Sequence, residues 1–153
     1  MIEINNESAM QIDESVLLRL TERNLAELRI SPDADLAIML VDEGAMEQLH
    51  LQWMDEPGPT DVLSFPMDEL RPGTDDRPTP AGLLGDIVLC PQVAETQAET
   101  AGHATIDELI LLTTHGLLHL LGYDHAEPEE HREMFALQQT LIDGFAAEER
   151  RRP

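Results

Sequence analysis

The sequence predicts an α+β fold, in which a single domain has a small mixed β-sheet packed with about five helices. Short apolar segments typical of buried strands interleave along the chain with longer segments of helical periodicity. The 153 residues, 42% of them hydrophobic, suffice for one core and are too few for two ordinary domains. No repeat or linker divides the chain, so we expect one domain over residues 1–146 and a charged C-terminal tail over residues 147–153.

Local signals mark the start of each expected helix. Asp13 precedes leucines spaced along one helical face, and its carboxylate can cap the helix. Pro91 and Pro128 suit the first turn of a helix. Thr105 and Glu108, three residues apart, predict a capping box before the most apolar helix. We expect strands at 2–4, 35–41, 61–65 and 83–90, and helices at about 13–28, 43–53, 91–101, 106–121 and 128–148.

Residues 66–82 predict a long surface loop. This stretch contains four prolines and two glycines. Long loops without regular structure in a compact domain are usually functional, so we expect this loop to contribute to function.

Charge is the most unusual feature of the composition. The chain has 31 acidic residues and nine basic ones, all of them arginine, for a formal net charge of −22. Such a chain binds nucleic acid poorly through general electrostatics, because phosphate contacts need clustered positive charge. A lone Cys90 excludes an internal disulfide, and no apolar run is long enough to cross a bilayer. Without a signal-peptide pattern, we expect a cytoplasmic protein that has no membrane partner.

Three of the six histidines lie within the stretch HGLLHLLGYDH. His115 and His119 are four residues apart near the end of the apolar helix, which places both rings on one face. Gly122 can take the left-handed conformation that ends a helix and turns the chain towards His125. We therefore predict His115, His119 and His125 as ligands of one metal ion per chain. Three neutral nitrogens with an open position suit catalytic Zn²⁺, although spacing alone leaves nickel, cobalt and iron open.

The spacing HxxxHxxGxxH matches the zinc-protease pattern HExxHxxGxxH at every specified position except one. Gly116 stands where proteases carry the glutamate that acts as general base. A peptidase needs that group, whereas phosphodiester cleavage relies more on the metal and on positioning. The zincin-like site therefore favours a phosphodiesterase. Gly116 would also allow close packing of the helix beneath the site.

Several other residues have two interpretations each. Asp124, beside the third ligand, is our candidate catalytic residue, and the alternative is that its carboxylate only stabilises the turn. Asp86 lies in an apolar strand, where it would hold a neighbouring loop or a histidine nitrogen. The simplest interpretation of Asp61 is that it stabilises the turn before the strand at 61–65. His131 is expected at the surface.

The stretch HGLLHLLGYDH resembles the H-G-x-L-H-L-x-G-Y-D-H signature of the YbeY family of bacterial endoribonucleases and rRNA maturation factors. PTDVLSFP at 59–66 and LGDI at 84–87 resemble two further family segments, in family order. The resemblance implies a zinc ion held by His115, His119 and His125 between helix and sheet, and metal-dependent cleavage of single-stranded RNA. It also implies roles in maturation of the 3′ end of small-subunit rRNA and in ribosome quality control. The implied partners are this RNA, the small ribosomal subunit and its assembly factors.

The chain departs from the family pattern just before the PTDVLSFP segment. Many members carry a Tyr-Arg pair whose arginine serves the active site, and the matching residues here are Trp53 and Met54. No arginine or lysine lies between positions 30 and 70, so Arg71 or Arg77 would have to replace that cation. The prediction is a zinc-dependent, single-strand-specific endoribonuclease. Two alternatives stay open. One is a non-enzymatic ribosome assembly factor whose zinc ion only joins the end of the helix to the turn, and the other is a zinc peptidase.

Overall fold

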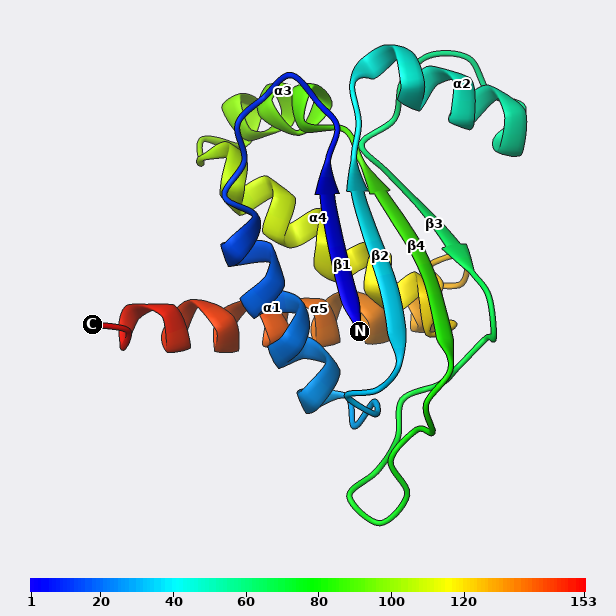
Figure 1. Ribbon diagram of the computed structural model, residues 1–153, viewed down its shortest axis with the longest axis vertical. Coiled ribbons are helices and arrows are strands. Elements are labelled where there is room, and N and C mark those ends of the chain that lie inside the picture. Colours follow the sequence, from blue (N-terminus) through cyan, green and yellow to red (C-terminus); the bar gives the residue numbers. More distant parts are fainter.

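Four strands form one mixed sheet in the computed structural model, which describes all 153 residues (Figure 1). The strands lie in the order β1-β2-β4-β3, with β1, β2 and β4 parallel and β3 antiparallel to β4 at the edge. The predicted fold class is confirmed. The strands are β1 (Ile2–Asn6), β2 (Asp35–Leu40), β3 (Val62–Pro66) and β4 (Leu83–Leu89).

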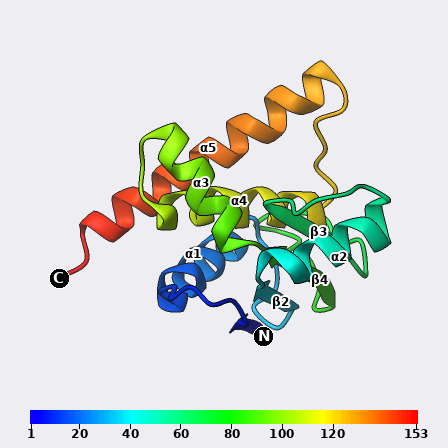
Figure 2. The same ribbon diagram turned by 90° about the horizontal axis from the view of Figure 1, so that it is seen from above.

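Five helices accompany the sheet, as predicted. Seen from above, α4 lies between the sheet and α5, so α4 is covered on both sides (Figure 2). No helix is both long and apolar enough to cross a membrane. The helices are α1 (Glu14–Glu27), α2 (Glu43–Met54), α3 (Pro91–Ala101), α4 (Thr105–Leu120) and α5 (Pro128–Arg150).

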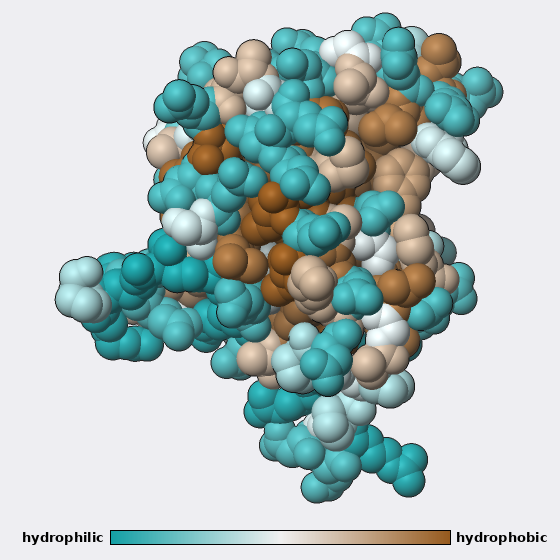
Figure 3. Space-filling view, viewed as in Figure 1, coloured by the Kyte–Doolittle hydropathy of each residue, from teal (hydrophilic) through white to brown (hydrophobic).

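The core is aliphatic and lies between the sheet and α4. Alternation along β2 places Leu36, Ile38 and Leu40 on the buried face, as a period of two requires. On the other face, α2 packs Met46 in a second apolar cluster with Val88 of β4. Apolar residues also gather over the middle of the face that Figure 1 presents (Figure 3). The fold therefore fixes α4 rigidly against β3 and β4.

The helix starts confirm most of the predicted caps. Asp13 caps α1 by accepting a hydrogen bond from the Ser15 backbone N–H at 3.1 Å, and prolines begin α3 and α5. The capping box predicted from Thr105 and Glu108 is wrong. Thr105 is already helical, so the cap is Ala104, whose backbone N–H donates to Asp107 at 3.2 Å. Alanine offers no side-chain acceptor in return, so only half of a capping box exists.

The long connection between β3 and β4 is an irregular loop, as predicted, and it is anchored close to the start of β4. The backbone of Thr79 exchanges hydrogen bonds with the corner between α1 and β2, through the Arg29 carbonyl at 2.8 Å and the Ser31 N–H at 3.0 Å. At the C-terminus, α5 runs to Arg150, so the first residues of the expected tail are helical. The boundary at residue 146 stays a prediction.

Candidate metal centre

The turn after α4 has the hydrogen bonds of a Schellman motif. The Gly122 N–H donates to the His119 carbonyl, and the Tyr123 N–H donates to the Leu118 carbonyl, both at 3.0 Å. Gly122 has a φ of +95°, a conformation in which a side chain would be strained. The predicted left-handed turn is present, and it carries the chain back so that His125 lies beside the end of α4.

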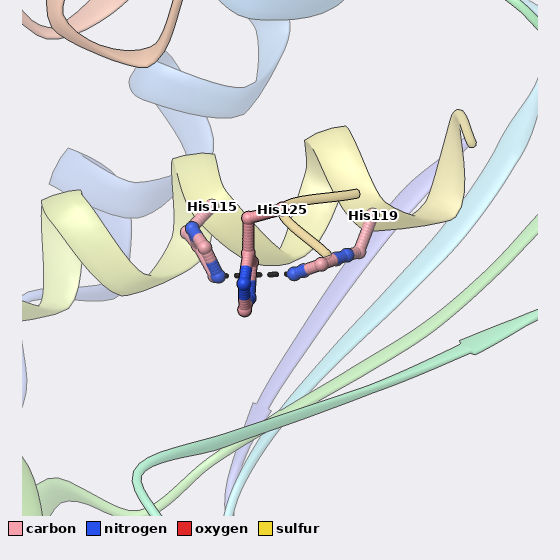
Figure 4. A group of neighbouring side chains, drawn as sticks. All are labelled: His115, His119 and His125. Carbon is pink, nitrogen blue, oxygen red and sulfur yellow. Dashed lines mark hydrogen bonds between the residues drawn. The ribbon is translucent and has the colours of Figure 1, made fainter. Parts of the chain in front are cut away.

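The three predicted ligands converge. His115 and His119 extend from α4, and His125 from the turn brings its ring against both (Figure 4). One ring nitrogen of each lies within 4.8 Å of the other two, and the Nε2 atoms of His115 and His119 are 3.0 Å apart. Nitrogens bound to one tetrahedral zinc ion at 2.0–2.1 Å lie about 3.3 Å apart. The cluster therefore has the size that such an ion requires.

Gln138 of α5 orients the first ligand, and sequence reasoning missed it. Its Oε1 lies 2.8 Å from His115 Nδ1, and its side chain is buried. When Nδ1 donates this hydrogen bond, the lone pair of Nε2 points into the cluster, as a metal ligand requires. The sequence contains one indication of this role: Gln138 is the one polar residue in the buried stripe of α5, which otherwise holds Met134, Leu141 and Phe145.

Burial keeps the two helical ligands neutral. It lowers the pKa of His115, an effect that the hydrogen bond to Gln138 partly opposes. It also lowers the pKa of His119, and the neighbouring histidines lower it further. Unprotonated imidazoles offer the lone pairs that a metal binds, so electrostatics and geometry agree.

A hollow of about 450 Å³ opens beside the cluster, which leaves room for a ligand next to the metal position. Met54 lines it where many family members carry arginine, and no basic residue takes part. The Arg71 guanidinium lies over Gly122 and lines a separate hollow, so neither Arg71 nor Arg77 replaces the missing cation inside the site. The lining consists of the three histidines with Met54, Asp61, Val62, Leu63, Ser64 and Pro66.

Close packing explains the glycine at position 116. A Cβ atom there would lie 3.0 Å from Ile87 Cγ2 and 3.1 Å from Ser64 Oγ. The Ser64 hydroxyl donates to the Gly116 carbonyl at 3.0 Å, which joins α4 to β3. The structural role predicted for Gly116 is present, because any side chain at this position would press on Ile87 and Ser64.

The acidic residues near the cluster differ in their placement. Asp124 accepts a hydrogen bond from the His125 N–H at 2.7 Å and lines the hollow that contains Arg71. Asp61 lines the hollow of the histidines. Asp86 faces a hollow with Glu3 and Asp35, and no hydrogen bond joins it to a histidine. A catalytic role for Asp124 stays a prediction.

The mixed sheet and the histidine cluster on a helix and turn define a zincin-like, metal-dependent class of hydrolase. The sequence model of one family, Endoribonuclease YbeY, matches residues 2–146. The chain belongs to the YbeY family and is an endoribonuclease, as predicted.

Relatives and a solved structure agree with this membership. A protein named Endoribonuclease YbeY from Clavibacter michiganensis subsp. michiganensis is 72% identical over 99% of both chains. A protein with the same name from Leifsonia xyli subsp. xyli is 68% identical over 97% of both. The solution structure of a Thermotoga maritima protein, 29% identical, superimposes with a TM-score of 0.66 and covers 98% of this chain and 92% of that one.

Proposed function

We propose that this endoribonuclease binds one zinc ion through His115, His119 and His125 and cleaves single-stranded RNA at that ion. The observation that carries the proposal is the convergence of three ring nitrogens beside an open hollow. We further propose that the substrate is the 3′ end of small-subunit rRNA, with a second role in ribosome quality control. The small ribosomal subunit and its assembly factors would be the partners, in the cytoplasm.

The residues of the hollow fit phosphodiester chemistry better than peptide chemistry. A bound zinc ion supplies Lewis acidity to a phosphoryl oxygen and acidifies water. Gln138 would orient the His115 ring toward that ion through its hydrogen bond to Nδ1. Asp124 is our candidate for proton transfer. Asp61 is the second candidate, because it is the one carboxylate among the residues that line the hollow.

Both alternatives to this proposal meet a structural objection. A zinc peptidase needs a glutamate near the metal, but the usual position holds Gly116 and no glutamate lines the hollow. A purely structural zinc ion is normally enclosed by four protein ligands. Here three histidines stand beside an open hollow, and no fourth ligand-forming side chain joins their cluster.

The test is cleavage of a labelled single-stranded RNA by the wild type and by His119→Ala, purified side by side. We expect the variant to lose bound zinc and at least about a hundredfold in activity, because two nitrogens hold a catalytic ion poorly. His103→Ala is the matched control, since His103 lies at the other end of α4 and contacts Glu108. If the wild type and His119→Ala cut alike, a contaminating nuclease is responsible and the proposal is wrong. If neither cuts, the assembly-factor alternative replaces it.

A further inference from the structure

We infer that His131 and Phe135 of α5 form a stacking platform for a nucleobase of the RNA held at the histidine cluster. The inference rests on the proposed cleavage of single-stranded RNA and adds the means by which the strand is held. It concerns two residues that take no part in the metal centre.

The two rings form a ready-made stack next to the predicted ligands. Their centroids are 4.3 Å apart, and the angle between their planes is 17°. Residues four apart on a helix share a face, so α5 presents both rings together. The Phe135 ring lies 5.6 Å from His115 and 6.1 Å from His125, between centroids. A base on this stack would therefore belong to a nucleotide adjacent to the metal position.

Phe135 is exposed in a chain that otherwise uses few aromatic residues. Only 3% of the residues are Phe, Trp or Tyr, and Phe145 on the same helix is buried. Phe135 is 37% exposed and lies next to the buried stripe of α5, outside the main core cluster. Its ring packs against the histidines, and the exposed part is available to a base.

The distribution of charge removes the usual alternative for holding RNA. The hollow has no basic residue. Arg19 and Arg23 form ion pairs with Glu149 and Glu148, and Arg29 pairs with Asp75 in the long loop. Arg71 over Gly122 and Arg132 beside His131 have no ion pair, but neither lines the hollow, so phosphate neutralisation is confined to the edge of the site. Stacking on an aromatic ring does not depend on charge, and every base has a face that can stack.

This mode of binding accounts for a preference for single strands. A base inside a duplex is already stacked and paired, so it cannot lie on the platform without being pulled out. It also predicts an unusual salt dependence. Each phosphate contact with a single strand contributes a slope of about −0.7 to a plot of log affinity against log salt concentration. Two contacts at most give a slope shallower than about −1.5, and the net charge of −22 makes it shallower still.

The experiment measures binding of a labelled 2′-O-methyl oligoadenylate by fluorescence anisotropy, and cleavage of a labelled RNA, with zinc-loaded protein. We expect Phe135→Ala to weaken binding about fivefold or more and to raise KM more than it lowers kcat. Phe135→Trp should restore binding, whereas Phe135→Leu, which keeps an apolar side chain, should not. His131→Ala should weaken binding in the same direction without loss of zinc. The wild type should prefer oligoadenylate to an abasic strand of equal length, and Phe135→Ala should lose that preference.

Leu18→Ala is the matched control, because Leu18 has the same exposed fraction of 37% on α1, outside the hollow of the histidines. The platform is refuted if Phe135→Ala and Phe135→Leu bind and cleave as Leu18→Ala does while the wild type remains active. A wild-type salt slope steeper than about −3 also overturns it, since at about −0.7 per contact that slope requires more than about four phosphate contacts. Loss of zinc in His131→Ala would make His131 a ligand instead of part of the platform. A wild type that neither binds nor cleaves RNA overturns the proposed function itself, and the platform with it.

Discussion

Helix α5 contacts two regions of contrasting electrostatics, the histidine cluster near its start and an arginine-rich region near its end. At the start, Gln138 holds His115, whose pKa burial lowers. At the end, Arg19 and Arg23 from α1 meet Glu149 and Glu148 at 2.7 and 2.6 Å. The two helical histidines of the cluster have lowered pKa values, which favours their neutral form, whereas the groups near the end of α5 are held as charged ion pairs.

The two regions have different roles. The histidine cluster is suited to binding a cation, and the arginine-rich region joins α1 to α5. The arginines in the ion pairs with α5 already have carboxylate partners, and exposed pairs of this kind contribute little to stability. In the cluster, two lone pairs face each other at 3.0 Å when both rings have Nδ1 protonated, which is unfavourable until a cation lies between them. A chain of net charge −22 can thus hold a metal ion tightly while keeping its own cations elsewhere.

Within this comparison the largest effect is expected from Gln138→Leu, which removes the hydrogen bond from α5 to a predicted metal ligand. Zinc affinity should fall about 10- to 100-fold, because loss of the partner frees the His115 ring to rotate. Stability should change little, since leucine suits the buried stripe of α5. Competition with a chelating dye measures the affinity, and Gln139→Leu at the adjacent exposed position is the control. Equal zinc affinity in the two variants would contradict the role given to Gln138.

Gly116→Ala tests whether the cluster depends on close packing of α4 against the sheet. The added Cβ atom meets Ile87 and Ser64 at 3.0 and 3.1 Å, so we expect a loss of about 1–3 kcal/mol in the free energy of unfolding. Urea denaturation measures it. Gly44→Ala is the control, because a Cβ atom in α2 meets nothing within 4 Å and alanine favours a helix. Similar stability in both variants would show that α4 can move off the sheet without cost.

Met54→Arg tests the comparison by bringing a cation to the histidine hollow. Met54 lines that hollow and is 46% exposed, so an arginine can reach a bound phosphate. We expect RNA affinity at low salt to rise several-fold and the salt slope to steepen by about 0.7. Leu51→Arg, on the same helix but outside the hollow, serves as the control. If both arginines increase affinity equally, the gain comes from net charge and not from the site.

The smallest effect is expected from Glu149→Gln in the arginine-rich region. Its hydrogen bond with Arg19 lowers the pKa of Glu149, so the folded state favours the ionised carboxylate. The stability from this pair is present above the ordinary glutamate pKa of about 4.3 and is lost as the pH falls through the lower, folded value. We expect a slight drop in Tm at pH 7 that vanishes in about 1 M salt or in strong acid. Glu99→Gln, at an exposed position of α3 without an ion pair, should show no drop in Tm. An equal drop in both variants would show that the Arg19–Glu149 pair contributes nothing specific to stability.

Sequence could predict the features that depend on neighbours along the chain. The cluster of three histidines could be predicted because helical spacing and one glycine turn place them together within eleven residues. The contact of Gln138 with His115 could not be predicted, since Gln138 lies on another helix, 23 residues further along the chain. The same holds for Arg71, which reaches Gly122 only because the long loop folds back. The predicted capping box failed by one residue, because backbone conformation at Ala104, which residue types alone do not fix, decides where α4 begins.

The Schellman turn at Gly122 has a consequence for how the protein folds. All three predicted ligands belong to one short segment, so the contacts among them have very low sequence separation and close only a small loop. Binding of the proposed zinc ion would need only the last turns of α4 and the glycine turn, and would not require that β1 has paired with β2. An ion bound that early would favour the correct end of α4, and zinc would then accelerate refolding as well as stabilise the finished domain.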